Sequence, residues 1–134
     1  EQDIIIMTAA VADFCPSHPA DEKIKKNDSS YESVIELERT EDILSYLGAH
    51  KAKGQLICGF SMETQNMLEN SKAKLAKKNA DMIVANNLKV AGAGFGTDTN
   101  VVTVITKDAV EELPMMSKEE VADALLDRIM KARQ

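Results

Sequence analysis

Residues 4–26, IIIMTAAVADFCPSHPADEKIKK, indicate the class of fold that the rest of the chain should adopt. The opening of this stretch, Ile4–Thr8, is a continuous apolar run, typical of a strand covered on both faces in a parallel sheet. Ala9–Asp13 then places small residues and an acid just past that strand. In open α/β sheets the carboxyl ends of the strands line the ligand crevice. Two prolines and three lysines follow, which predicts an extended arm carrying charges suited to an anion.

Strand-like and helix-like patterns alternate downstream of this stretch. The order predicts an α/β fold with a mainly parallel sheet and a C-terminal β-hairpin, formed by all 134 residues as one domain. The expected strands after the first are Tyr31–Glu38 as an exposed strand, Gln55–Phe60, Asp81–Asn86, Val101–Thr106 and Val110–Leu113. The expected helices are Glu41–Lys51 capped by Thr40, Glu63–Asn79 with Thr64 as its cap, and a last helix opened by the capping box Ser117–Glu120.

Helical spacing also predicts which side chains face the core. The inward positions are Ile43, Leu44 and Leu47 on the first helix, Met67, Leu68, Leu75 and Ala76 on the second, and Val121, Leu125 and Ile129 with Ala122, Leu126 and Met130 on the last. Phe60 is expected at the carboxyl end of its strand, beside Gly59. There it could stack on a base or fill core, since aromatic side chains dominate core packing.

Composition excludes several classes of protein. The net charge of −6 argues against general nucleic-acid binding, and no apolar run approaches the roughly 18 residues that span a bilayer. Cys15 and Cys58 are too few for a disulfide framework and fit a reducing cytoplasm. Together with His18 and His50 they match no common zinc spacing. The chain begins without Met, and a strand follows almost at once, so we expect it to be part of a longer protein.

Lysines gather at two places in this acidic chain. Lys23, Lys25 and Lys26 form one cluster, and the other comprises Lys72, Lys74, Lys77 and Lys78. Lys74 and Lys78 are four residues apart, so they share a helix face, where like charges repel. Two interpretations stay open: the pair serves a local anion site, or the lysines are ordinary solvated surface.

Two further features bear on the kind of ligand. The glycines of AGAGFGTDTN, residues 91–100, are spaced G-x-G-x-G and no helix follows, so the dinucleotide fingerprint fails and we interpret the stretch as a flexible loop that could close as a lid. Asp13 could accept hydrogen bonds from a base or sugar, help hold a metal ion, or simply cap a turn.

Five blocks, taken in order, resemble the phosphopantothenate–cysteine ligase family, also called phosphopantothenoylcysteine synthetase. They are AAVADF, P-x4-D-E-K-I-K-K, GFSMET, K-x2-KK-NADMIVAN and GFGTDTN, and they extend across nearly all of the chain. The resemblance implies a three-layer Rossmann-like fold with an extended dimerisation arm. In many bacteria this ligase is the C-terminal domain of a bifunctional coenzyme A biosynthesis protein, so a flavin-dependent decarboxylase domain is expected upstream.

The same resemblance implies a reaction in two halves. The carboxylate of 4′-phosphopantothenate attacks the α-phosphate of CTP, giving an acyl-cytidylate and pyrophosphate, and the amine of cysteine then displaces CMP. Mg²⁺ would offset the triphosphate charge, with metal ligands unassigned. Carried over by position, Lys23 is the catalytic lysine. The nucleotide-binding set is Met7, Thr8, Ala9, Asp13, Lys23, Glu41, Asp42, Ile43, Leu44, Phe60, Lys74 and Lys78.

The chain departs from the family pattern in one important respect. The family's earlier G-P-T segment and S-N-x-S-S-G stretch are absent, so the chain resembles the C-terminal two-thirds of the ligase domain. Three functions therefore compete. The first is the CTP-dependent ligase, acting as a homodimer in which Lys23 serves the neighbour's site. The second is a truncated module that binds CTP or dimerises without ligase activity. The third is an unrelated, dehydrogenase-like nucleotide-binding domain.

Overall fold

A computed structural model describes residues 2–23, 34–63, 66–87, 90, 92–93 and 96–133. The chain forms two compact units. The larger unit comprises Glu1–Thr8 with Ile43–Gln134, and the smaller unit, Ala9–Asp42, is inserted between them in sequence. Lys25, Lys26 and the first three residues of the predicted strand Tyr31–Glu38 lie outside the described residues.

The larger unit is built on a five-stranded sheet with the order β1-β4-β5-β7-β8. β1, β4 and β5 are parallel, β7 is antiparallel to β5, and β8 is antiparallel to β7. Four of the five strands thus run in one direction, which is the Rossmann-like α/β arrangement expected from the alternating pattern. The strands are β1 Ile4–Met7, β4 Leu56–Glu63, β5 Met82–Asn87, β7 Val102–Thr106 and β8 Val110–Glu112.

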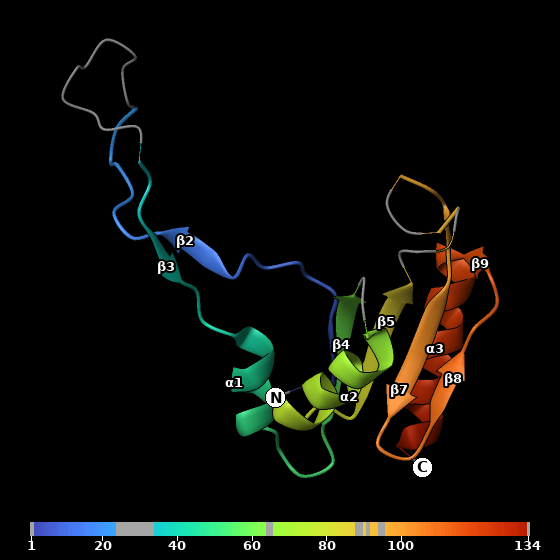
Figure 1. Ribbon diagram of the computed structural model, residues 1–134. Helices are drawn as coiled ribbons and strands as arrows, with labels where there is room; N and C mark the ends of the chain where they lie inside the picture. Colours follow the sequence, from blue (N-terminus) through green and yellow to red (C-terminus); the bar gives the residue numbers. More distant parts are fainter. Residues whose placement is uncertain are drawn as a thin grey trace. The chain divides into compact units, whose positions relative to one another are not determined.

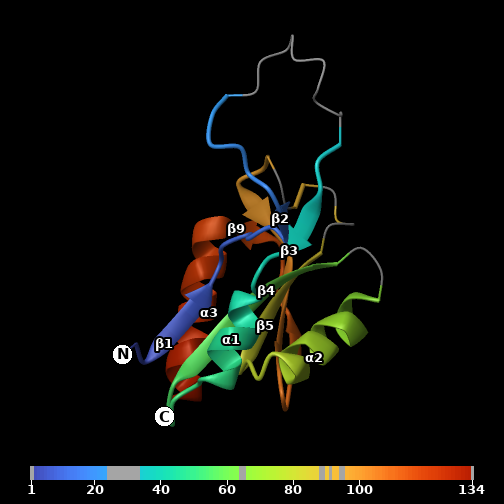
Figure 2. The same cartoon turned by 90° about the vertical axis from the view of Figure 1, so that its left-hand side faces the viewer.

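Helices cover both faces of this sheet. α1 (Ile43–Ala49) and α2 (Met67–Lys77) pack on one face, and α3 (Lys118–Ala132) packs on the other. Figure 2 shows the resulting layers, with α3 and α2 on opposite sides of the strands, and Figure 1 shows α1 next to α2. Strand alternation separates the apolar side chains into two clusters, so Ile83 faces α1 and α2 whereas Val84 faces α3.

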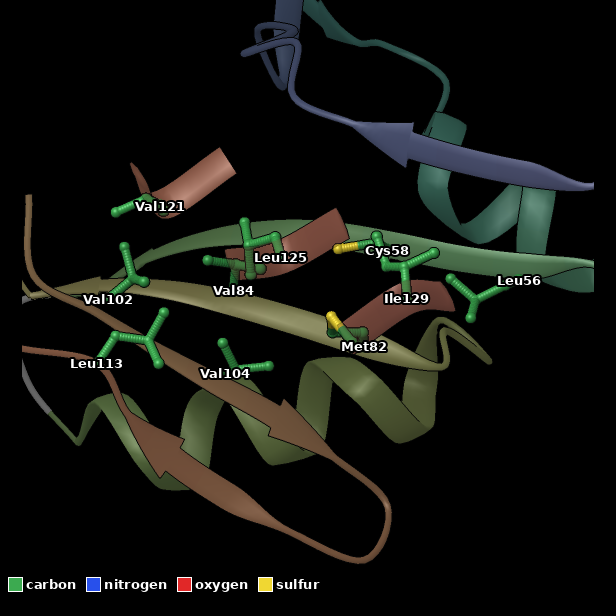
Figure 3. Close-up of a cluster of buried hydrophobic side chains, with 10 residues drawn as sticks. All are labelled: Leu56, Cys58, Met82, Val84, Val102, Val104, Leu113, Val121, Leu125 and Ile129. Carbon is green, nitrogen blue, oxygen red and sulfur yellow. The ribbon is translucent and has the colours of Figure 1, made fainter. Parts of the chain in front are cut away.

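The core on the α3 side follows the helical spacing of the last helix. Val121, Leu125 and Ile129 are buried against side chains of β4, β5 and β7, as Figure 3 shows. Ser117 accepts a hydrogen bond from the Glu120 amide, and the Glu120 carboxylate accepts one from the Ser117 amide. The capping box and the core positions of Val121, Leu125 and Ile129 are therefore as predicted.

The predicted apolar stripe also included Ala122, Leu126 and Met130, and for these three residues the prediction of a core position is wrong. Leu126 and Met130 are 49% and 54% exposed, and Ala122 is exposed as well. The helix touches the sheet along one narrow line, so positions about 100° away from that line face outward. Apolar character alone did not distinguish these outward positions from the buried line of Val121, Leu125 and Ile129.

The other two helices start later than predicted. α1 begins at Ile43, whose side chain is 39% exposed, while Leu44 and Gly48 are buried. Thr40 does not cap it, because the Thr40 hydroxyl donates to the Ala12 carbonyl instead (2.5 Å).

The late start of α2 reflects a longer strand before it. Glu63 still belongs to β4, Thr64 lies outside the description, and α2 begins at Met67 after Asn66. Leu68 and Ala76 are exposed, whereas Ser71 and Leu75 are buried. The buried line of α2 is therefore rotated from the predicted one.

The smaller unit contains a two-stranded antiparallel ribbon. β2 (Phe14–Pro16) pairs with β3 (Leu37–Arg39), so the strand predicted within Tyr31–Glu38 lies further along the chain, and Pro16 is in a strand rather than a loop. Ser17 and Thr40 amides extend the ladder by donating to the Glu36 and Asp13 carbonyls, each at 3.0 Å.

The stretch before β7 also contains a short strand. β6 (Thr99–Asn100) pairs with β9 (Met116–Ser117), the strand that leads into α3. Part of the predicted loop 91–100 is thus extended backbone, and residues 91, 94 and 95 are outside the description. Across the described ranges, the helices are too short and too polar to cross a bilayer.

Candidate functional site

The paired lysines of α2 lie on the face of the helix that is turned toward the sheet. The Lys74 ammonium donates to the Phe60 carbonyl of β4 (3.0 Å), and the Lys78 ammonium donates to the Ser45 hydroxyl of α1 (2.9 Å). Both side chains are half-buried, whereas Lys72 and Lys77 are exposed. The interpretation of all four lysines as solvated surface is therefore wrong for this pair.

Helical geometry explains why this pair points inward. Ser71 and Leu75 are the buried residues of α2, and positions 74 and 78 lie on the same side of the helix. The described hydrogen bonds of the two ammonium groups go to a carbonyl of β4 and a hydroxyl of α1, and these bonds hold both positive charges on the sheet side of α2. The last turn of a helix also favours cations through its dipole, which stabilises lysines there without any ligand.

Phe60 lies inside β4, not at its carboxyl end. β4 continues to Glu63, and Phe60 packs partly against the α3-side core. β1 ends at Met7, opposite Gly59, so Phe60 is the first residue of β4 beyond the pairing with β1. Its carbonyl is therefore the contact for Lys74, and its ring belongs to the core side of the sheet.

α1 approaches β4 closely at Gly59. A Cβ on Gly59 would lie 2.8 Å from Leu44 Cδ2 and 3.1 Å from Ile83 Cδ1. Leu44 thus fills the space above a glycine of β4, and the next residue, Ser45, is the partner of Lys78. Of the predicted nucleotide-binding residues, Leu44, Lys74, Lys78 and the Phe60 backbone come together here, with Met7 paired next to them.

The other predicted residues belong to the smaller unit or to its junction with α1. Ala9, Asp13 and Lys23 are exposed within Ala9–Asp42, and Glu41 and Asp42 are exposed just before α1. The Asp13 carbonyl is used in the ribbon, where it accepts from Thr40. Their roles toward a ligand stay predictions, as does that of Thr8, which is exposed after β1.

The junction between α1 and α2 contains residues that the sequence interpretation did not single out. The Asn79 side-chain amide donates to the Gly48 carbonyl (2.8 Å), and the Lys51 ammonium donates to the Asn79 carbonyl (3.0 Å) and to Asp81 (2.9 Å). Asn79 directly follows Lys78. Asn79 is also the last residue of the helix predicted over Glu63–Asn79, and an asparagine at a helix end is a usable signal because Asn tolerates the left-handed backbone of helix stops.

Thiols and metal ligands are not concentrated at this site. Burial raises the pKa of the Cys58 thiol to about 12. His50 stacks on Tyr46, with ring centroids 4.2 Å apart, on the exposed side of α1. Within the ranges that the structure covers, the His, Cys, Asp and Glu residues form no group of three or more suited to a metal ion.

A parallel-strand core flanked by helices, with two inward-facing ammonium groups beside the central strands, defines a Rossmann-like α/β domain with a candidate anion site. The chain belongs to the DNA/pantothenate metabolism flavoprotein C-terminal domain family, whose sequence profile matches residues 1–132. The family membership predicted from the five sequence blocks is thereby confirmed.

Individual relatives agree with this assignment. The chain is 51% identical over 128 residues to the coenzyme A biosynthesis bifunctional protein CoaBC of Bacillus subtilis (strain 168), a match covering 95% of this chain and 31% of that protein. It is 47% identical over 131 residues to a cysteine/cysteine sulfinic acid decarboxylase from an unknown prokaryotic organism, covering 97% of this chain and 36% of that protein. The chain thus spans about a third of the length of these relatives.

A solved structure matches the fold. The crystal structure of the C-terminal domain of coenzyme A biosynthesis bifunctional protein CoaBC superposes with a TM-score of 0.74 at 46% identity. The match covers 97% of this chain and 56% of that one. The predicted Rossmann-like α/β fold is therefore confirmed.

Proposed function

We propose that the chain is the nucleotide-binding part of a phosphopantothenate–cysteine ligase of coenzyme A biosynthesis. In this reaction the 4′-phosphopantothenate carboxylate attacks the α-phosphate of CTP and releases pyrophosphate. The amine of cysteine then attacks the acyl carbon and releases CMP. The observation that carries the proposal is the inward-facing pair Lys74 and Lys78, in a chain 51% identical to a coenzyme A biosynthesis protein.

The lysine pair supports the nucleotide half of this chemistry. Attack at the α-phosphate builds negative charge on phosphate oxygens, and fixed cations that already face the site stabilise that charge. Lys74 and Lys78 are held on the sheet side of α2 by hydrogen bonds to β4 and α1, which supports their use as fixed cations for a polyphosphate. We assign the two ammonium groups to the triphosphate of CTP.

Mg²⁺ is proposed to arrive bound to the triphosphate. Mg²⁺ keeps several waters and is commonly held through substrate phosphates and one or two carboxylates. The described residues provide no preformed cluster of metal ligands, so no catalytic step is assigned to a protein-bound metal.

Pyrophosphate release tests the ligase proposal directly. The chain is incubated with CTP, Mg²⁺ and 4′-phosphopantothenate, and CTP binding is measured separately by calorimetry. We expect both CTP binding and pyrophosphate release, and we expect Lys23→Gln to suppress the release. Lys53→Gln, which removes another exposed lysine, is the matched control and should keep the wild-type rate.

The results separate the competing functions. CTP binding without pyrophosphate release would identify these 134 residues as a binding module and would contradict ligase activity of the chain on its own. Binding of NADH in preference to CTP would indicate the dehydrogenase-like alternative. Release at the wild-type rate by the Lys23→Gln variant would show that Lys23 is not the catalytic lysine.

A further inference from the structure

We propose that Asn79 is a positioning residue that fixes the Lys78 ammonium for polyphosphate binding by tying the end of α2 to α1. The inference rests on the proposed nucleotide-binding role of Lys78. It adds a function for Asn79, a residue that the proposed function does not include. Lys78 is the C-cap residue of α2, directly before Asn79, and its ammonium donates a hydrogen bond to Ser45 on α1. Its ammonium is therefore placed correctly only if α1 and α2 keep one relative position.

The first step of the argument is how α2 ends. Asn79 has φ 48°, in the left-handed region, and its amide donates to the Ala76 carbonyl (3.2 Å). The Ala80 amide donates to the Leu75 carbonyl (3.1 Å). This pair of bonds is a Schellman motif, in which the left-handed position most often holds glycine. Glycine would satisfy the backbone here, so the Asn79 side chain must be explained by something other than the helix stop.

The side chain of Asn79 has such a use. Its amide nitrogen donates to the Gly48 carbonyl at 2.8 Å, which joins the last turn of α1 to the end of α2 across 31 residues of sequence. The helix stop and the tie between helices are thus made by one residue.

Gly48 makes the contact close enough for this tie. A Cβ at Gly48 would lie 1.8 Å from the Lys78 carbonyl oxygen, far inside van der Waals contact. Any other residue at 48 would push α1 away from the Lys78 backbone. The glycine, which lowers helix propensity by about 1 kcal/mol, is here the condition for α1 to contact α2.

Lys51 makes a third contact at the junction between α1 and α2. The Lys51 ammonium bridges the Asn79 carbonyl and the Asp81 carboxylate, and the other Asp81 oxygen accepts from the Ile57 amide of β4 (2.8 Å). The end of α2 is therefore bonded both to α1 and, through Asp81, to the start of β4. Within this frame the Lys78 side chain leaves from a backbone fixed on both sides.

Binding of inorganic tripolyphosphate to the complete chain tests the proposal. Asn79→Gly keeps the left-handed backbone and removes only the side-chain tie. Losing one neutral hydrogen bond of this kind should weaken tripolyphosphate and CTP binding between about twofold and tenfold. CMP lacks the β- and γ-phosphates, so its affinity should change less than that of CTP. A general loss of fold would lower both, so the ratio of CTP to CMP affinity isolates the position of Lys78.

Asn66→Gly is the matched control. Asn66 also has a left-handed backbone, at φ 49°, it stands at the other end of α2, and its side chain makes no capping hydrogen bond. Its replacement should leave the CTP to CMP ratio unchanged. Asn79→Ser, which removes the amide donor without adding a charge, should behave like Asn79→Gly and guards against an unfolded glycine variant.

Lys78→Met separates failure of this proposal from failure of the proposed function. If Lys78→Met weakens tripolyphosphate binding and both Asn79 variants bind like the wild type, the positioning role is overturned and the nucleotide role of Lys78 stands. If Lys78→Met itself binds tripolyphosphate and CTP like the wild type, both are overturned.

Discussion

Lys74 and Lys78 differ from their neighbours on α2 in what their ammonium groups contact. Lys72 and Lys77 face outward, as most lysines do. Lys74 and Lys78 are half-buried and bonded to oxygens of β4 and α1. At the scale of single residues, the candidate site is a matter of where a long cationic side chain ends, because the four lysines are chemically identical.

The two cysteines should also behave differently. Cys58 is fully buried in β4 with a pKa of about 12, whereas Cys15 is partly exposed. The thiolate is the reactive form, so only Cys15 should be labelled by a maleimide reagent at pH 8 in the folded protein. Mass spectrometry should find one modified thiol per folded chain and two after denaturation in guanidinium chloride.

A Cys15→Ser variant provides the control for this labelling. It should remain almost unmodified until it is unfolded. Equal modification rates at both sulfurs in the native wild-type chain would mean that β4 opens on the timescale of labelling, contrary to its place inside the sheet.

Individual side-chain roles were only partly predictable from sequence. The face shared by Lys74 and Lys78 followed from their spacing, and the structure places both inward. Phe60 was misplaced, because an apolar run shows that a strand exists but not how far it continues into polar residues such as Ser61. The partners of Asn79 and Lys51 depend on contacts across about 30 residues, which no local pattern encodes.

At the scale of elements, α3 shows what helical periodicity can and cannot predict. Its capping box and its buried line were both predictable, since each depends on local spacing. The outward position of Leu126 was not, because the sequence does not define the width of the contact with the sheet. The same uncertainty rotated the predicted buried line of α2.

Neighbouring leucines of α3 should therefore differ in their effect on stability. Leu125 is 5% exposed and Leu126 is 49% exposed. Leu125→Ala should lower the free energy of unfolding by about 2–5 kcal/mol, because it leaves a cavity in a packed core. Leu126→Ala should lower it by less than about 1 kcal/mol, as is usual for exposed positions.

Urea unfolding followed by circular dichroism measures both changes. The two variants remove the same atoms from the same helix, so helix propensity cancels in the comparison. Similar losses for both would mean that Leu126 is covered by a surface that the described residues do not form.

At the scale of the whole molecule, the two units differ in what stabilises them. The larger unit has an apolar cluster on each face of its sheet. In the described part of Ala9–Asp42 no residue is buried, and the ribbon depends on backbone hydrogen bonds and on contacts such as Arg39 over the Phe14 ring. Strand–helix alternation predicted the larger unit. It gave no basis for the register of a ribbon whose strands bury nothing.

This difference predicts two levels of amide hydrogen exchange. Amides of β4 and β5, which pair on both sides within the sheet, should exchange only when the larger unit unfolds. Amides of the ribbon, such as Ser17 and Thr40, should exchange much faster at low protein concentration, since little apolar surface opposes their opening. Peptide-resolved mass spectrometry at several times of exchange would measure both.

The concentration dependence of the same experiment bears on the predicted dimerisation arm. Phe14 and Leu37 are 50% and 59% exposed on the ribbon, and their apolar surface would be buried if a second copy packed there. If the ribbon packs against a second copy, its amides should become protected as the concentration rises through the dissociation constant, while those of β5 should not change.

Fast ribbon exchange that is independent of concentration, in a chain that sedimentation shows to be dimeric, would place the dimer contact elsewhere. Ribbon amides as protected as β5 even when the chain is monomeric would contradict the two-level prediction itself, because exposed strands would then be stabilised by something other than burial.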